Sequence, residues 1–67
     1  MEFTTHDLTE AKRQIDSTLH KLRETIKTLE LKEDMNRYKS QITLAKRRVD
    51  AFEIANCLIE AEINKRQ

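Results

Sequence analysis

The apolar residues in the first half of the chain recur at the spacing of one face of an α-helix. They are separated by seven, four, three, four and three positions: Leu8, Ile15, Leu19, Leu22, Ile26 and Leu29. The positions between them carry mostly Lys, Arg, Glu, Gln, Ser and Thr, so the pattern predicts an amphipathic helix with a single apolar stripe. Thr4 and Asp7 are spaced as in a capping box, with Phe3 and Leu8 at the hydrophobic staple positions, so we expect this helix to begin near residue 5.

A second apolar stripe follows in the other half of the chain, with a strict alternation of three and four. Its members are Ile42, Ala45, Val49, Phe52, Asn56, Ile59 and Ile63. This heptad pattern predicts a second helix that runs to near the C-terminus. A lone polar residue such as Asn56 at a seam position often fixes register and oligomeric state. The alternative for Asn56 is a tolerated polar residue that is hydrogen-bonded to water or to its own backbone.

The segment between the two stripes contains neither Gly nor Pro, so the turn is located only by the point at which the helical spacing of the apolar residues changes. The stripe that ends at Leu29 is not continued through residues 32–37, where Asp34 or Asn36 could cap a new helix. The alternative is one continuous helix, because Leu31, Met35 and Tyr38 extend the second heptad backwards. That alternative requires the stripe to slip between Leu29 and Leu31.

The distribution of charge favours the turn. A chain that folds back near residue 35 opposes Leu29 to Ile42 and Leu8 to Ile63, and it gives pairings of favourable sign along its length. The acidic residues Glu24 and Glu30 come near the basic part of the second helix, and the basic pair Lys12 and Arg13 comes near Glu60 and Glu62. Exposed pairs are worth only ~0–1 kcal/mol each, so they select a register more than they stabilise a fold. The sequence predicts an all-α, antiparallel, coiled-coil-like hairpin that forms one domain over residues 1–67, with helices at about 5–31 and 37–65 and a turn at about 32–36.

The second helix has further apolar residues on the side opposite its heptad seam: Leu44, Ala51, Ile54, Leu58 and Ala61. This stripe is centred roughly 160° from the seam, so the first helix cannot cover both. The corresponding positions of the first helix are polar, which makes the second helix the central one: Gln14, Ser17, Lys21, Glu24 and Thr28. We expect a homodimer joined through the second helix into a four-helix bundle. The alternative is that these are scattered apolar surface residues, which are common in proteins.

Composition limits the class of protein further. The chain has 67 residues, of which 37% are hydrophobic and 37% charged, with no Gly or Pro. A chain of this size is close to the limit for a stable single core, so it needs a partner or a second copy of itself. The net charge of +1 and the single Cys57 indicate neither a global electrostatic field nor an internal disulfide. Without a signal peptide pattern or a run of roughly 20 apolar residues, we expect a cytoplasmic location and no membrane partner.

The sequence offers few candidates for chemistry. His6 and His20 lie fourteen residues apart without further metal ligands at suitable spacing, and no Glu-x-x-His motif occurs. Cys57 has no nearby base that could activate its thiol, and we expect it to pack as a small hydrophobic residue. We therefore expect no catalytic residue, no metal, no cofactor and no enzymatic activity.

One cluster of charge remains, with no acidic residue between Asp34 and Asp50: Arg37, Lys39, Lys46, Arg47 and Arg48. These cations wrap around the helix, and we expect a solvated face whose charge is neutralised by Glu24, Glu30 and Asp34. The sequence predicts a small intracellular protein that acts by protein–protein association, as a homodimeric adaptor, a regulator or an accessory subunit. The alternative is a nucleic-acid-associated regulator that uses this basic cluster for phosphate contacts. A third class is a subunit that completes the active site of another chain.

Overall fold

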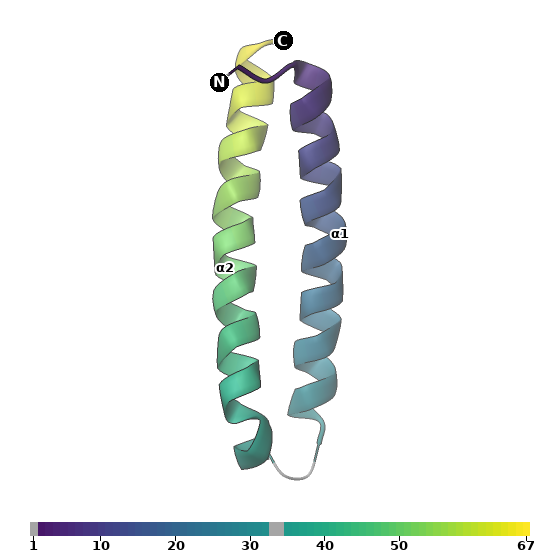
Figure 1. Cartoon of the computed structure of the whole chain (residues 1–67), viewed down its shortest axis with the longest axis vertical. Coiled ribbons are helices and arrows are strands. Elements are labelled where there is room, and N and C mark those ends of the chain that lie inside the picture. Colours follow the sequence, from purple (N-terminus) through teal and green to yellow (C-terminus); the bar gives the residue numbers. More distant parts are fainter. Residues whose placement is uncertain (1, 33–34) are drawn as a thin grey trace.

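The fold is an antiparallel hairpin of two long helices. The computed structural model describes residues 2–32 and 35–67, and these form α1 (Thr5–Glu30) and α2 (Met35–Lys65), with no strand among them. The two helices run side by side, and the N- and C-termini lie at the same end (Figure 1). The molecule measures 48 × 17 × 15 Å, which is the length of one long helix and the width of two. The predicted all-α hairpin is confirmed, and the continuous helix is wrong.

The capping box at the start of α1 is present as the sequence predicts. The backbone N–H of Asp7 donates to the Thr4 hydroxyl at 3.0 Å, and the backbone N–H of Thr4 donates to the Asp7 carboxylate at 3.1 Å. Both bonds satisfy donors that the first turn of a helix leaves without intrahelical partners. The pKa of Asp7 is lowered, because the backbone N–H and then the side chain of Thr4 favour its ionised carboxylate.

The connection between the helices is shorter than the sequence indicated. α1 ends at Glu30, and the backbone N–H of Leu31 donates to the carbonyls of Lys27 and Thr28 at 3.2 and 3.3 Å. α2 begins at Met35, two residues before the expected start at 37, so Asn36 lies within the first turn of the helix and does not precede it as a cap. The other candidate cap, Asp34, lies outside the described residues.

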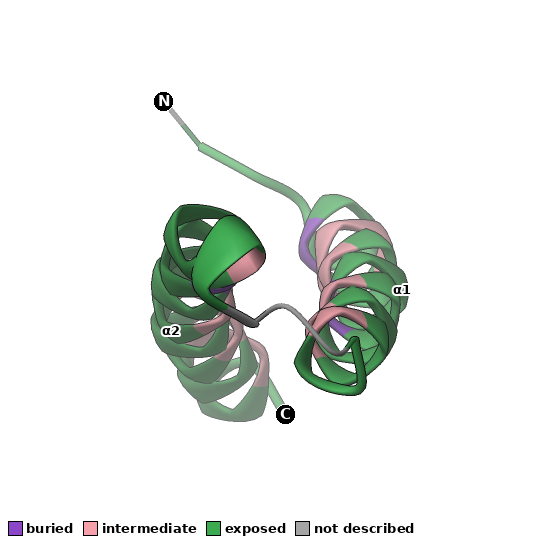
Figure 2. Cartoon of the chain, turned by 90° about the horizontal axis from the view of Figure 1, so that it is seen from below, coloured by how far each residue is buried: buried purple, intermediate pink, exposed green. Residues whose placement is uncertain are grey.

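The core is a single seam between the two helices. Among the described residues, four apolar side chains are buried, and two come from each helix: Leu8, Leu19, Ile42 and Ala45. The other members of the two predicted stripes are half-buried: Ile15, Leu22, Ile26, Leu29, Val49, Phe52, Asn56, Ile59 and Ile63. Viewed along the helices, the buried and half-buried residues face one another and the exposed residues lie outside (Figure 2). Each helix covers only one side of its neighbour, so the core remains thin.

Polar contacts cross the seam at three levels. Arg23 forms an ion pair with Glu53, and Lys46 lies 3.4 Å from Glu30. Closer to the end that holds both termini, the Asn56 side-chain amide donates to the Asp16 carboxylate at 2.5 Å. The contact of Glu30 with the basic part of α2 is the one the charge pattern predicts.

The basic pair near the start of α1 pairs within its own helix. Lys12 lies 3.2 Å from Asp16, and Arg13 lies 2.9 Å from Glu10. On α2, Glu62 pairs with Arg66 at 3.3 Å and with Lys65 at 4.0 Å. Lys12 and Arg13 therefore form no ion pair with Glu60 or Glu62 among the described residues, because each pairs with a residue three or four positions away on its own helix.

The segment before α1 is tied to the end of α2. The Arg66 guanidinium donates to the carbonyl of Phe3 at 2.8 Å and to the hydroxyl of Thr5 at 3.4 Å. Phe3 remains 51% exposed and, with Leu8, Ala11 and Ile59, lines a groove of about 550 Å³ at this end. Phe3 thus lies beside Leu8, as expected for a hydrophobic staple, and also faces α2.

Candidate interaction surface

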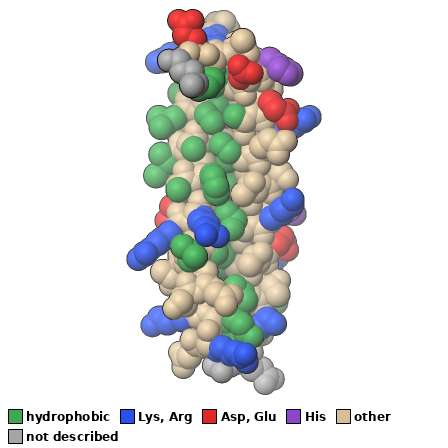
Figure 3. Space-filling view, viewed as in Figure 1, with side chains coloured by type: hydrophobic (Ala, Val, Ile, Leu, Met, Phe, Trp, Pro, Cys, Tyr) green, Lys and Arg blue, Asp and Glu red, His purple; other side chains and the backbone are tan. Residues whose placement is uncertain are grey.

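Five apolar residues of α2 form an exposed face, which we call the outer face: Leu44, Ala51, Ile54, Leu58 and Ala61. The large side chains are open to solvent, with Leu44 49%, Ile54 62% and Leu58 67% exposed. Hydrophobic side chains gather over α2 and over the groove between the helices, whereas the α1 side is largely polar and charged (Figure 3). A contiguous apolar face on a small protein marks an interaction surface more often than scattered single residues do.

The outer face is exposed because of where the seam lies on α2. The seam residues of α2 turn toward α1, and the outer face lies on nearly the opposite side of the same helix. α1 has one apolar side and one polar side. α2 has apolar residues on two opposite sides, so it is less clearly amphipathic than α1. On α1, the corresponding positions away from the seam are polar and exposed, as the sequence indicated: Gln14, Ser17, Lys21, Glu24 and Thr28.

Leu44 differs from the other members of the outer face. It lines a groove of about 220 Å³ together with Leu22, Leu29 and Ala45, so part of its side chain lies against the seam. Ile54 and Leu58 are more exposed and do not line any of the described grooves. The centre of the outer face is therefore the pair Ile54 and Leu58, with the smaller Ala51 and Ala61 on either side.

Cys57 lies next to this face and is exposed. The expectation that it packs as a small hydrophobic residue is wrong for the hairpin, because position 57 falls on neither the seam nor the centre of the outer face. Its thiol is accessible to reagents.

Asn56 is the polar member of the seam and is half-buried. Its amide donates to Asp16, while its carbonyl oxygen is buried and has no hydrogen-bond partner among the described residues. The Asn56 amide, and then the Lys12 ammonium, lower the pKa of Asp16 by hydrogen-bonding to its ionised form. Asn56 therefore links a defined position on α1 to one on α2, which is the role of a residue that fixes register. Among the described residues, the Asn56 amide thus bonds across the seam and not to its own backbone.

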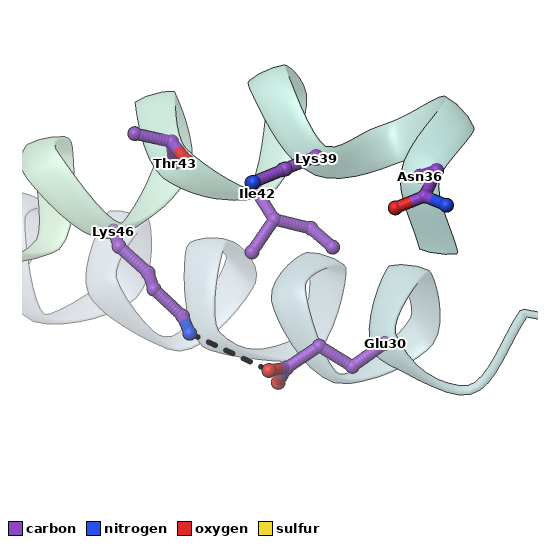
Figure 4. Close-up of a pocket in the computed structure, with 6 residues that line it drawn as sticks. All are labelled: Glu30, Asn36, Lys39, Ile42, Thr43 and Lys46. Atoms are coloured by element: carbon purple, nitrogen blue, oxygen red, sulfur yellow. Dashed lines mark hydrogen bonds and ion pairs between the residues drawn. The ribbon is translucent and has the colours of Figure 1, made fainter. Parts of the chain in front are cut away.

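The basic cluster of α2 lies on the surface near the turn. All five of its residues are exposed: Arg37, Lys39, Lys46, Arg47 and Arg48. Lys46 reaches Glu30 of α1 across a groove of about 360 Å³ that Asn36, Lys39 and Thr43 also line (Figure 4). The guanidinium of Arg37 lies 5.8 Å from the centre of the Tyr38 ring.

The expected neutralisation of this cluster is therefore partial. Glu30 neutralises Lys46, whereas Glu24 forms no ion pair within the described part of the chain, and Asp34 lies outside it. Lys39, Arg47 and Arg48 make no ion pair with any described residue. Three cations remain available to an anionic partner.

Neither a metal-binding cluster nor a membrane-spanning helix is present among the described residues. Residues 2–32 and 35–67 contain no group of three or more His, Cys, Asp or Glu side chains that could hold a metal ion. Both histidines are exposed, and they lie at separate levels of α1. Neither described helix combines the length and the apolar character needed to cross a membrane.

Comparisons with protein-family models, with curated proteins and with solved structures found no match to this chain. The class of protein is therefore the one that the fold and the surface define, which is a two-helix hairpin with an exposed apolar face on its second helix.

Proposed function

We propose that this protein acts by protein–protein association through the outer face of α2, as a homodimeric adaptor, a regulator or an accessory subunit, and that two hairpins join into a four-helix bundle. The observation that carries the proposal is the exposure of Ile54 and Leu58, at 62% and 67%, side by side on a helix whose other side is the seam. Covering them removes apolar surface from water, which is the dominant favourable contribution to most associations. The proposal assigns the protein no catalytic activity, cofactor or metal.

The thin core supports the same proposal. With four buried apolar side chains among the described residues, the isolated hairpin has little of the burial that stabilises small domains. A partner on the outer face would bury the apolar side chains of α2 that the hairpin leaves exposed. Association would then contribute to folding as well as to function.

The test compares two substitutions by aspartate, one on the outer face and one on α1, by light scattering and circular dichroism over a concentration series. Leu58→Asp should convert the dimer into a helical monomer, because it places an unpaired carboxylate in the apolar contact. Since Leu58 is 67% exposed in the hairpin, the same change should leave the helices largely intact. Lys21→Asp on the polar side of α1 is the matched control and should remain dimeric.

Three outcomes would oppose the proposal. A wild-type chain that stays monomeric at every concentration would remove the homodimer, and an unchanged mass for Leu58→Asp would remove the outer face as the contact. Should Leu58→Asp lose its helical signal, Ile54→Ser is the second variant. A dimer of Ile54→Ser with unchanged affinity would then place the contact elsewhere.

A nucleic-acid-associated regulator is the second candidate function, and the unpaired cations Lys39, Arg47 and Arg48 favour it. Phosphate contacts by these residues would give an affinity for DNA or RNA that falls steeply with salt. Fluorescence anisotropy of a labelled duplex, measured at two salt concentrations with wild type and with an Arg47→Ala, Arg48→Ala variant, tests it. An affinity that is equal for both proteins would exclude this cluster as a nucleic-acid site.

A further inference from the structure

We propose that the partner on the outer face is a second copy of this chain, packed antiparallel about a two-fold axis at the level of Asn56. In this arrangement Ile54 faces Leu58 of the partner subunit, and Ala51 faces Ala61 of the partner subunit. The inference rests on the proposed function and specifies its geometry.

The spacing of the outer face reads the same in both directions along the helix. Ala51, Ile54, Leu58 and Ala61 are separated by three, four and three residues, with a small residue at each end and two large ones in the middle. An antiparallel copy therefore presents the same order of sizes. The alanines allow the two helix backbones to approach closely, while the isoleucine and leucine fill the space between them.

Charge beside the outer face favours the antiparallel pair. From Met35 to Val49, α2 carries only cations, and from Asp50 to Asn64 it carries only acids. A parallel pair would place Arg47 and Arg48 beside the same cations of the other chain, and like charges across an interface are destabilising. In the antiparallel pair with its axis at Asn56, residues 37–46 and their cations lie beyond the end of the partner helix, and Arg48 comes near the acidic Glu62 of the partner subunit.

The chosen register gives these charges specific partners. Arg48 flanks the outer face and comes opposite Glu62 of the partner subunit, and the two-fold axis repeats this contact at the other end. In the hairpin Arg48 is exposed and has no ion pair with a described residue, so it is available for this contact. Asp50 in turn lies near Lys65 of the partner subunit.

The register also accounts for the different environment of Leu44. The overlap of the two helices extends from residue 47 to residue 65, so Arg47 meets Lys65 of the partner subunit at each end, where both side chains extend into solvent, and Leu44 lies beyond the end of the partner helix. Leu44 is the large residue of the outer face that already lies partly against the seam, in the groove with Leu22 and Leu29. Ile54 and Leu58, the two most exposed large residues of the outer face, lie at the centre of the overlap.

Cys57 provides the test, because it is the only cysteine of the chain, is exposed, and lies beside the proposed axis. In this register Cys57 faces Cys57 of the partner subunit, so a short bis-maleimide should link the native protein into a covalent dimer in high yield. The matched control is Asp50→Cys with Cys57→Ser. The two copies of position 50 lie about 20 Å apart along the axis in this register, so this variant should not cross-link to itself.

The pattern of cross-links distinguishes the arrangements. A parallel pair would link both the native protein and the position-50 variant. A shifted antiparallel pair would place Cys57 near position 50 of the other chain, so that Asp50→Cys with Cys57 retained would link while the native protein would not. Either pattern in a dimer overturns this register and leaves the proposed association standing, whereas a monomer in light scattering overturns both.

A charge exchange supplies an independent readout. Arg48→Glu alone should weaken dimerisation about tenfold, since both symmetric pairs become like-charged. Arg48→Glu with Glu62→Arg should dimerise more tightly than Glu62→Arg alone, which also loses the pairs of Glu62 with Lys65 and Arg66. Lys39→Glu is the control, because residue 39 lies outside the overlap, and its dimer affinity should stay within about twofold of wild type. Equal weakening by Lys39→Glu and Arg48→Glu, without recovery in the exchange, would overturn the assigned contact.

Discussion

The substitution Leu19→Ala tests the seam most directly. Leu19 is 4% exposed, the lowest fraction among the buried apolar residues. Full burial of a leucine side chain stabilises by ~1.5–3 kcal/mol, and truncation in a core costs ~2–5 kcal/mol once the cavity is included. A seam between two helices is open on both sides and can partly close over the gap. We therefore expect a loss of about 2–3 kcal/mol in the free energy of unfolding.

Leu31→Ala is the matched control, because it makes the same chemical change at a residue that is 81% exposed. Its loss should stay within about 0.5 kcal/mol, since little apolar surface is buried there. Both variants are measured by urea unfolding with far-ultraviolet circular dichroism, at several protein concentrations so that any contribution from association is separated from that of the seam. Equal losses for the two variants, or less than about 1 kcal/mol for Leu19→Ala, would refute the assignment of the buried face.

Three further outcomes follow from the polar contacts. Thr4→Ala removes the hydroxyl that caps α1 and should lower the free energy of unfolding by about 1 kcal/mol, measured by the same urea titration. The pKa of Asp16 is lowered in the fold, so its stabilising contribution is present above the ordinary pKa of an aspartate and is lost as the pH falls through the lowered value. Asp16→Asn should therefore reduce stability near neutral pH, and its difference from wild type should shrink in acid; a constant difference between thermal midpoints at the two pH values would contradict this. The ion pair between Arg23 and Glu53 has both side chains about half exposed, and a double-mutant cycle to alanine should give a coupling of ~0.2–1 kcal/mol; a larger value would mean that the pair is less hydrated than its exposure indicates.

Local patterns made the helices predictable from the sequence. The capping box at Thr4 and Asp7 depends on residues three apart, and the two stripes depend on helical periodicity, so each is encoded within a short stretch of chain. The start of α2 was less well determined. Without Gly or Pro near residues 31–36, nothing in the sequence stops one helix or starts the next at a fixed residue, and an apparent cap such as Asn36 can lie inside the helix.

Contacts between the helices were harder to predict than the helices themselves. The seam pattern fixes which faces meet, but the partner of a long charged side chain depends on competition between its own helix and the neighbouring one. Lys12 therefore bonds to Asp16 on α1, and Asp16 in turn accepts from Asn56 on α2. The bond from Arg66 to the carbonyl of Phe3 had no sequence signal, because any carbonyl near the end of α2 could have accepted it.

The same two turns of α2 contain the polar member of the seam and the most exposed large residues of the outer face. Asn56 interrupts the apolar seam, and its carbonyl oxygen is buried without a described partner. Ile54 and Leu58, two residues to either side, lie in solvent. In the proposed dimer these turns form the centre of the interface, so association would cover the large apolar residues that the hairpin leaves in solvent. Stability that rises with protein concentration is the consequence, because a partner that binds only the folded chain shifts the unfolding equilibrium by mass action.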